Sequence, residues 1–309
     1  MRKTIDSLLA EIRSDNRSGA SELAGKAVEC LFAFLDSFQG KTHQDFVRAL
    51  CVVGQDITEA QPAMAPLFNL VNRVLLRAEE TEDLTGYKEV VRKEVRDFKR
   101  TLERGWEVMV DSTWPLLRDG SSILVHSYSA TLCRVLVALH NRRKVFSVTC
   151  TESRPLLEGI TLARRLVGNG ISVRLIVDSA AFQLLDEMHL MLVGADTISP
   201  FGVTNKIGTR GLAMAAQCQD IPFYVLAGTD KCLPMDVQVH LEEETRSPEE
   251  ILQSGEPIEV FNFYFDRTPL AWVSGVITER GLWTMGQLQK YLKNLKIHPV
   301  LTGLQKEHQ

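Results

Sequence analysis

A carboxylate, an amide and an ammonium stand close together in the sequence, beside two glycines. Asp196 comes two residues after Gly194, and the pair Asn205 and Lys206 comes shortly before Gly208. A carboxylate and an amide can hydrogen-bond the hydroxyl groups of a small ligand, and an ammonium can balance an anionic group on it. These side chains are therefore the first candidates for a binding site.

Their position in the chain supports a site. The apolar run Leu190–Val193 is typical of a buried strand, and it places Asp196 just past the carboxyl end, where α/β proteins bind small ligands. We expect Lys206 to open the Ala-rich helix that follows, so that both charges point to one crevice. The structural alternative is that Asp196 caps a turn and Lys206 is a solvated residue of a first helical turn.

Composition limits the class of protein. A chain of 309 residues with 45% hydrophobic content can bury the core of one or two domains, and no window is a continuous apolar run of about 18 residues. The first residues, Met1–Asp6, turn polar before a secretory core could develop, which favours a cytoplasmic protein that does not enter a membrane. The net charge of -4 gives no reason to expect direct nucleic-acid binding.

Cysteine spacing and glycine motifs argue against cofactors. The six cysteines include no CxxC pair, and no cluster of metal-ligand residues is visible, so we expect reduced cysteines and no metal. The chain has neither GxGxxG nor GxxxxGK[ST], the phosphate-binding motifs of nicotinamide enzymes and nucleoside triphosphatases. We therefore expect no cofactor.

Hydrophobic periodicity divides the chain into two regions. Helical spacing in the first region predicts a helical domain at residues 1–115, ending in one long charged helix over Tyr87–Met109. Short apolar runs then alternate with helical stretches, which predicts a Rossmann-like, doubly wound parallel sheet at residues 116–309 that carries most of the ligand site. The expected strands are Ile123–Val125, Val145–Val148, Val173–Val177, Leu190–Val193, Phe223–Ala227 and Val276–Thr278, and an irregular acidic segment, Glu242–Pro257, precedes the last of them.

Polar residues follow five of these strands in succession. Because parallel strands end at one edge of a sheet, such residues should share one crevice. They are His126–Ser129, Thr151–Pro155, Asp178–Ser179, Asp196 and Asp230–Lys231.

Several of these motifs together resemble a known family. The segments Thr151–Pro155, Gly194–Asp196, Asn205–Thr209 and Pro222–Val225 are similar to the alpha, beta and delta subunits of translation initiation factor 2B. The same superfamily contains methylthioribose-1-phosphate isomerase and ribose-1,5-bisphosphate isomerase, and Phe265–Pro269 looks more like the latter. The resemblance covers roughly residues 10 to 285 and implies a helical domain followed by a Rossmann-like domain, a phosphorylated small-molecule ligand, and a homodimer or larger homo-oligomer.

The resemblance also implies two catalytic positions. The isomerases use a cysteine and an aspartate, which correspond here to Ser127 and Asp196. A thiol titrates near about 8.5 and can exchange protons after a modest shift, whereas a serine hydroxyl needs a dedicated base. Cys133 lies farther along, in the following helix, and is more typical of a core residue than of a substitute.

A phosphate loop is the other inherited feature. The segment Asn16–Ser21 resembles the Arg-x-Gly-Ala loop of the isomerases, with Arg17 supplying charge and Gly19, Ala20 and Ser21 offering backbone N–H groups at a helix start. An ordinary N-cap by Ser18 or Ser21 is the structural alternative. An Arg-Pro pair that holds phosphate in the isomerases is replaced here by Gln61-Pro62.

Two functions are consistent with these residues. In the first, the protein binds a sugar phosphate, or a nucleoside phosphate, and is an aldose-1-phosphate to ketose-1-phosphate isomerase acting through Asp196. Arg154 and Lys206 would neutralise phosphate, and Asn205 would orient a hydroxyl. In the second, it is a non-catalytic regulatory subunit or metabolite sensor of the factor 2B alpha type, because Ser127 replaces the cysteine.

Overall fold

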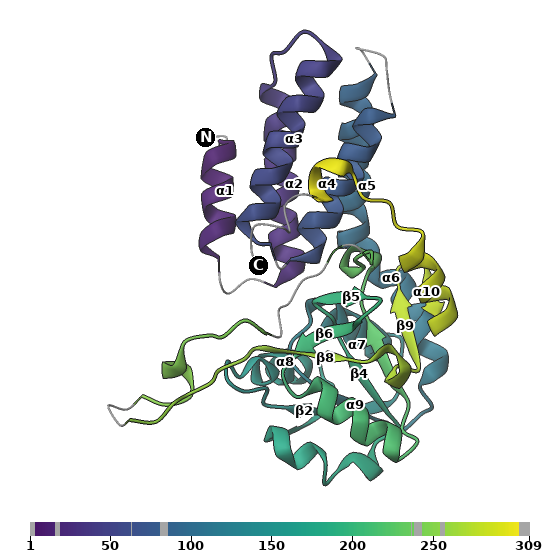
Figure 1. Ribbon diagram of the computed structural model, residues 1–309. Coiled ribbons are helices and arrows are strands. Elements are labelled where there is room, and N and C mark those ends of the chain that lie inside the picture. The colour runs from purple at the N-terminus through teal and green to yellow at the C-terminus, as the bar shows by residue number, and fades with distance from the viewer. Residues whose placement is uncertain are drawn as a thin grey trace. The chain divides into compact units, whose positions relative to one another are not determined.

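The chain forms two compact units in the computed structural model, which describes residues 4–15, 19–62, 64–80, 86–235, 237, 243–253 and 257–302 (Figure 1). The first unit consists of Met1–Arg104, Asp230–Val239 and Leu292–Gln309, and the second of Gly105–Thr229 and His240–Tyr291. A compact unit need not fold by itself, so the division into domains at residues 115 and 116 stays a prediction.

The first unit is helical. Its elements are α1 (Ile5–Ser14), α2 (Ala20–Ser37), α3 (His43–Ala60), α4 (Ala65–Glu79), α5 (Tyr87–Arg104) and the short α11 (Pro299–Thr302). Apolar residues at helical spacing form one core, with α4 the most extensively buried helix. The charged helix α5 buries only Tyr87, Val91, Val95 and Phe98.

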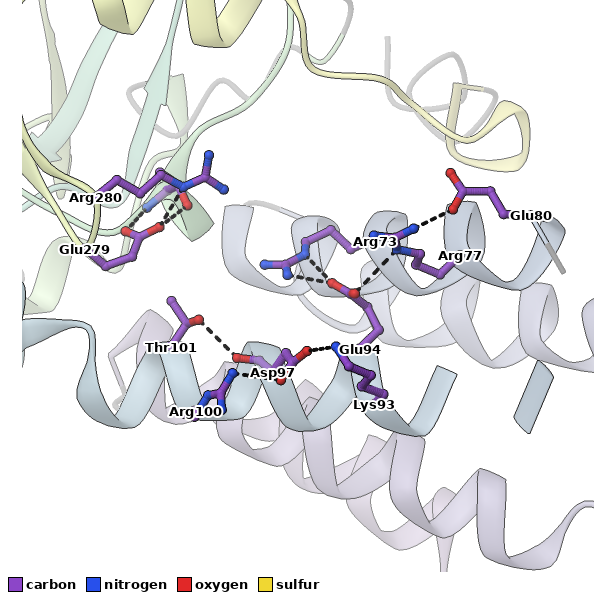
Figure 2. A network of polar contacts seen from close by, with 11 residues as sticks. Arg73, Arg77, Glu80, Lys93, Glu94, Asp97, Arg100, Thr101, Glu279 and Arg280 are labelled. Carbon is purple, nitrogen blue, oxygen red and sulfur yellow. Dashed lines mark hydrogen bonds and ion pairs between the residues drawn. The ribbon is translucent and has the colours of Figure 1, made fainter. Parts of the chain in front are cut away.

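The charged residues of α5 form ion pairs, several of which are visible in Figure 2. Glu94 accepts hydrogen bonds or ion-pair contacts from two arginines of α4, with 2.5 Å to Arg73 and 3.7 Å to Arg77. Asp97 pairs with Lys93 and Arg100 on its own helix. These pairs are mostly solvent-exposed and each contributes little to stability, so α5 is fixed mainly by its narrow apolar stripe.

Two buried amides of α4 hold later parts of the chain. Asn69 Nδ2 donates to the carbonyl oxygens of Asp230 (2.7 Å) and Cys232 (2.8 Å). Asn72 Nδ2 donates to the Lys296 carbonyl at 2.8 Å, and Asn72 Oδ1 accepts from the His298 N–H at 2.8 Å. A buried amide that satisfies backbone groups in this way fixes segments that lie outside the α-helices and sheets.

The second unit is built on a seven-stranded sheet in the order β10-β9-β7-β4-β1-β2-β3. Neighbours are parallel except β10 and β9, which are antiparallel. The strands are β1 (Ser121–Val125), β2 (Phe146–Thr151), β3 (Ser172–Ile176), β4 (Leu190–Val193), β7 (Phe223–Leu226), β9 (Gly275–Thr278) and β10 (Gly281–Trp283). The helices between or beside them are α6 (Trp106–Thr113), α7 (Ala130–Asn141), α8 (Glu158–Val167), α9 (Thr209–Cys218) and α10 (Met285–Lys293).

This architecture confirms the expected fold class, a helical region followed by a mostly parallel α/β sheet. Each of the six expected strands is present with small shifts of its ends. Short 3-10 turns connect several elements, at Trp114–Leu116, Asp178–Ala181, Leu185–Glu187, Thr229–Lys231, Pro248–Glu250 and Leu270–Trp272.

Two local predictions were wrong. The single helix expected over Tyr87–Met109 is two helices, because the chain breaks between them at Gly105, a residue with low helix propensity. Lys206 does not open a helix either, since it is the last residue of strand β6 (Gly202–Lys206), and α9 begins three residues later after Gly208, whose φ is +103°.

Strand β6 belongs to a second, smaller sheet that the periodicity did not indicate. It pairs antiparallel with β5 (Thr197–Ser199) and with β8 (Phe265–Thr268). Polar residues such as Thr204 and Asn205 are buried on β6, so its sequence lacks the apolar run that marks a buried strand. Of the helices that the structure describes, none is long and apolar enough to cross a membrane.

The buried amide of Asn72 provides a test of how the helical unit is held. Asn72→Ala leaves the carbonyl of Lys296 and the N–H of His298 without their partners, so we expect the free energy of unfolding to fall by about 2 kcal/mol. Urea denaturation followed by circular dichroism measures this. Gln44→Ala, at an exposed position of α3, is the control and should change stability by less than about 0.5 kcal/mol; equal effects of the two variants would contradict the assigned role.

Candidate functional site

The ends of β1 and β4 define the point in the sheet where the strand order reverses. From β1 the chain runs outward through β2 to β3 and then returns to place β4 on the opposite side of β1. In open α/β sheets, ligands bind at such a switch point, outside the carboxyl ends of the strands. Ser127 follows β1 and Asp196 follows β4, so the structure brings these two candidate residues to the same edge of the sheet.

A glycine lets the two strand ends come close. A Cβ on Gly194 would lie 2.8 Å from the Cβ of Ser129, which is shorter than side chains allow. Ser129 in turn caps α7, its hydroxyl accepting a hydrogen bond from the N–H of Leu132. The close approach after β4 therefore depends on glycine at position 194.

A buried imidazole joins three chain segments at this edge. His126 is 3% exposed, its Nδ1 lies 2.6 Å from the Thr151 hydroxyl and its Nε2 lies 2.8 Å from the Ile207 carbonyl. Since a carbonyl can only accept, Nε2 carries the proton and Nδ1 accepts from Thr151. Burial lowers the pKa of His126, in agreement with a neutral ring. Both nitrogens are thus engaged in holding structure.

The hydroxyl chain continues from Thr151 to the backbone of Ser127. The Thr151 and Ser153 hydroxyls lie 3.0 Å apart, and Ser153 Oγ accepts a hydrogen bond from the N–H of Ser127 at 2.8 Å. Ser127 has a φ of +70°, an uncommon backbone conformation for a residue other than glycine. Within the described part of the chain, its own hydroxyl has no hydrogen-bond partner that could act as a base.

None of the six cysteines, all of which lie among the described residues, offers a reactive thiol beside Ser127. Cys150 is fully buried on β2, opposite Val125, and burial raises its pKa to about 12. Burial also raises the pKa of Cys133. A raised pKa disfavours the thiolate, so these cysteines behave as small apolar residues. None of the six forms a disulfide, and Cys218 alone among them is exposed.

Asp196 and Asn205 are positioned by the small sheet. The N–H of Asp196 donates to the carbonyl of Thr204 at 2.9 Å, which places the carboxylate at the junction of β4 and β5. Asn205 is 5% exposed, and its Nδ2 donates to the Thr209 hydroxyl at 2.9 Å. The Thr209 hydroxyl donates in turn to the carbonyl of Lys206 at 2.6 Å.

Lys206 is buried and already has an acidic partner. Its Nζ lies 2.8 Å from Glu158 Oε1, and the two side chains are 4% and 28% exposed. The same ammonium lies over the rings of Tyr264 (4.6 Å) and Phe265 (5.4 Å). Sequence reasoning missed Glu158, because a glutamate at the start of an amphipathic helix is an ordinary residue there.

Arg154 lies at the edge of this group and is exposed. The backbone N–H groups of Ser153 and Arg154 both donate to the carboxylate of Asp178, at 2.7 and 2.8 Å. The guanidinium makes one long contact, 3.4 Å, to the carbonyl of Glu250. The chain turn is thus fixed by Asp178, which leaves the Arg154 side chain at the surface.

The first turn of α9 is occupied by a protein carboxylate. Asp266 of β8 accepts hydrogen bonds from the N–H groups of Gly208 (2.7 Å) and Arg210 (3.0 Å). Its pKa is raised to about 6 by burial, against the lowering effect of these backbone donors. An anion at this helix start would have to displace Asp266, so the sequence motif that contains this residue has a structural use.

The phosphate loop lies in the helical unit and is described only in part. Arg17 and Ser18 lie outside the described residues. Gly19 is the N-cap of α2 and forms no side-chain cap, so Ser21 does not cap the helix; Ala20 is buried and Ser21 half-buried. The N–H groups at the start of α2 are the donors that such a loop would present.

Gln61, which replaces the arginine of the isomerase pair, is committed to the end of α1. Its Nε2 donates to the carbonyl oxygens of Ile12 (3.0 Å) and Asp15 (3.3 Å). The Asp15 carboxylate is also paired with Lys26. Gln61 therefore fixes the backbone at the end of α1, up to Asp15.

No metal site was found among the described residues, since none of their His, Cys, Asp and Glu side chains form a group of three or more suited to a metal ion.

A helical region followed by a mostly parallel α/β sheet, with polar residues at the edge where the strand order reverses, defines the fold class of this chain. Comparison with known proteins identifies the family. The family model for the initiation factor 2 subunit family matches residues 16–285, and the chain belongs to this family.

Individual relatives match nearly the whole chain. A protein of Pyrococcus abyssi named putative translation initiation factor eIF-2B subunit 2-like is 32% identical, with 89% of this chain and 94% of the relative covered. The ribose 1,5-bisphosphate isomerase of Archaeoglobus fulgidus is 31% identical, with 88% and 87% covered. The crystal structure of a Pyrococcus horikoshii translation initiation factor eIF-2B superposes with a TM-score of 0.75 at 29% identity, over 91% of this chain and 97% of that one.

The buried imidazole predicts a specific pH dependence. His126 stays neutral in the folded chain, whereas the unfolded chain protonates it near about pH 6.5, so its contribution to stability is present above that pH and is lost as pH falls below it. Charges near the ring include Asp178, Glu158 and Lys206. We expect the free energy of unfolding of wild type to exceed that of His126→Gln at pH 7.5, and the difference to shrink toward pH 5.

Guanidinium denaturation of both proteins across this pH range measures the difference. Because the other six histidines are common to both, subtraction isolates the contribution of His126. A difference that stays constant or grows toward pH 5 would show that the ring takes up a proton in the folded state.

Proposed function

We propose that this chain is a cytoplasmic protein that binds a sugar phosphate at the switch point of the sheet, with Asp196 accepting hydrogen bonds from a sugar hydroxyl. The observation that carries the proposal is that Asp196 and Ser127 follow the adjacent parallel strands β4 and β1, at the same edge of the sheet. Relatives of the chain include a ribose 1,5-bisphosphate isomerase. A carboxylate at this position can accept hydrogen bonds from sugar hydroxyls, whether the ligand is a sugar phosphate or a nucleoside phosphate.

The proposed ligand-binding residues come from several elements. Asn205 orients a hydroxyl, Lys206 contributes through its pair with Glu158, and the exposed guanidinium of Arg154 is available for a phosphate. In the helical unit, the proposed phosphate-binding residues are Arg17, Gly19, Ala20 and Ser21. No cofactor, metal, membrane or nucleic acid enters the proposal.

Catalysis is the first of two functions for such a site. The protein would convert an aldose 1-phosphate to a ketose 1-phosphate, with Asp196 as the acid or base and Ser127 in the position of the family cysteine. The relatives that are isomerases by name support this assignment.

Regulation is the second, and a specific observation favours it. The Ser127 hydroxyl has no base among the described residues, and burial keeps Cys133 and Cys150 from replacing a thiol. A relative named as an initiation factor subunit covers the chain equally well. In this function, the site recognises the sugar phosphate without turning it over and reports occupancy to a partner protein.

Carbon-13 NMR with labelled ribose 1,5-bisphosphate and methylthioribose 1-phosphate tests the site and separates the two functions. We expect bound-ligand shifts with wild type, and an affinity at least about tenfold weaker with Asp196→Asn, because a charge-assisted hydrogen bond is lost. The exposed Asp186→Asn is the matched control and should bind as wild type does.

The ketose signals decide between the two functions. Ketose that forms with wild type and Asp186→Asn but not with Asp196→Asn establishes the isomerase. Binding without ketose establishes the regulatory function, and equal binding by all three proteins would remove Asp196 from the site.

We also propose that the chain forms a homodimer or a larger homo-oligomer. Strand β3 is an open edge of the seven-stranded sheet, and apolar side chains in and after it are exposed, namely Leu175 (46%), Val177 (53%) and Phe182 (49%). An open edge with exposed apolar residues is typical of an interface.

Light scattering coupled to gel filtration measures the assembly. We expect at least twice the chain mass of 34.7 kDa for wild type and a single chain mass for Leu175→Asp. Val52→Asp, an equally exposed apolar position of α3, should leave the mass unchanged; a monomeric wild type would refute the assembly.

A further inference from the structure

The environment of Lys206 differs from that of a cation that binds phosphate. Its ammonium is enclosed by a carboxylate oxygen of Glu158 at 2.8 Å and by two aromatic rings, and the side chain is 4% exposed. An ammonium has three donors, and here one points to a charged acceptor while the rings of Tyr264 and Phe265 lie against the same cation. The positive charge is already balanced inside the protein.

The partner in this pair is the group with spare bonding capacity. Glu158 Oε2 is shielded from solvent and has no hydrogen-bond partner among the described residues. A buried carboxylate oxygen without a donor is costly, and such atoms in native structures are usually satisfied by a water or a ligand. At this ion pair, the atom that can form a further hydrogen bond is therefore an acceptor, Glu158 Oε2.

Neighbouring residues hold the pair in place. The Tyr264 hydroxyl donates to Glu250 Oε1 at 2.5 Å, and the Arg246 guanidinium lies over the Tyr264 ring, 5.2 Å from its centroid. Asn262 Nδ2 donates to Glu250 Oε2 at 2.8 Å. Because Tyr264 is fixed by these contacts, Lys206 cannot leave Glu158 without disturbing the aromatic ring over which it lies.

We infer that Glu158 is a specificity-determining residue of the site: it cancels the charge of Lys206, excludes phosphate from the end of β6, and presents its free oxygen to a hydroxyl of the ligand. This inference rests on the proposed function for the identity of the ligand. It changes the role of Lys206 from a phosphate ligand to a positioning residue that holds the Glu158 carboxylate. The phosphate of the ligand is then left to a cation outside this pair, such as the exposed guanidinium of Arg154.

Glu158→Gln tests the exclusion of phosphate. The substitution keeps the shape of the side chain and removes its charge, so the Lys206 ammonium is no longer balanced. We expect inorganic phosphate to bind Glu158→Gln at least tenfold more tightly than it binds wild type. Isothermal titration calorimetry on the full chain measures both affinities. Glu187→Gln removes one negative charge from an exposed pair with Arg174 and is the control, with an expected change below twofold.

A double variant makes the test independent of any cost to folding in the single one. Glu158→Gln with Lys206→Met replaces the buried pair by two neutral residues of similar shape, a change that proteins often tolerate. We expect its affinity for inorganic phosphate to lie within twofold of wild type, because a balanced pair is replaced by a neutral one. A tenfold loss would show that Lys206 binds phosphate directly and would overturn the inference.

The ligand hydroxyl is tested with ribose 1,5-bisphosphate by the same calorimetry. If wild type binds inorganic phosphate at least tenfold more weakly than Glu158→Gln does, the exclusion of phosphate by Glu158 is supported. If wild type in addition binds no sugar phosphate, only the proposed function is refuted. If wild type binds the sugar phosphate but Glu158→Gln binds inorganic phosphate no better than the control, the proposed function survives and the inference about Glu158 is refuted.

Discussion

The arrangement of the site depends on the hydrogen bonds of one buried imidazole. His126 follows β1, accepts from a hydroxyl at the end of β2, and donates to a carbonyl just beyond β6. A neutral ring with both nitrogens used can be buried at little cost, whereas a protonated ring would lose the bond from Thr151. The seven-stranded sheet and the small sheet are thus joined at the edge where Ser127 and Asn205 lie.

Charge at this edge is compensated within the protein. Lys206 is balanced by Glu158, and the start of α9 by Asp266. Both features would attract an anion if they stood alone, since a buried ammonium and the N–H groups at a helix start are common phosphate-binding elements. With both already paired, hydrogen-bond acceptors rather than unpaired positive charge characterise this part of the candidate site, and the guanidinium of Arg154 is exposed.

The family relationship and the local chemistry bear on different parts of the function. Membership in the initiation factor 2 subunit family follows from a match over most of the chain and agrees with the fold. Turnover depends on single atoms instead, and at position 127 a hydroxyl stands on a backbone with positive φ. An alcohol is a far weaker acid than a thiol, so retention of the fold and of Asp196 does not by itself supply an isomerase.

The sequence alone determined the order of helices and strands, because apolar periodicity is a local property. The buried runs at Leu190–Val193 and Phe223–Ala227 marked strands, and their succession with helices implied a doubly wound sheet. The sequence also placed Ser127 and Asp196 after strands that end at the same edge. It did not reveal β5, β6 and β8, since those strands bury polar residues such as Thr204 and Asn205 and so lack an apolar run.

Only the tertiary structure decided which charged side chains pair with one another. In the sequence, Lys206 is separated from Glu158 by 47 intervening residues and from Tyr264 by 57, and nothing in their local context links them. Folding brings the ammonium within 2.8 Å of the carboxylate and 4.6 Å of the ring centre. Periodicity reports which residues are buried, but the partner of a buried charge is set by long-range contacts. Candidate site residues could therefore be proposed from the sequence, whereas the charged partners of those residues could not.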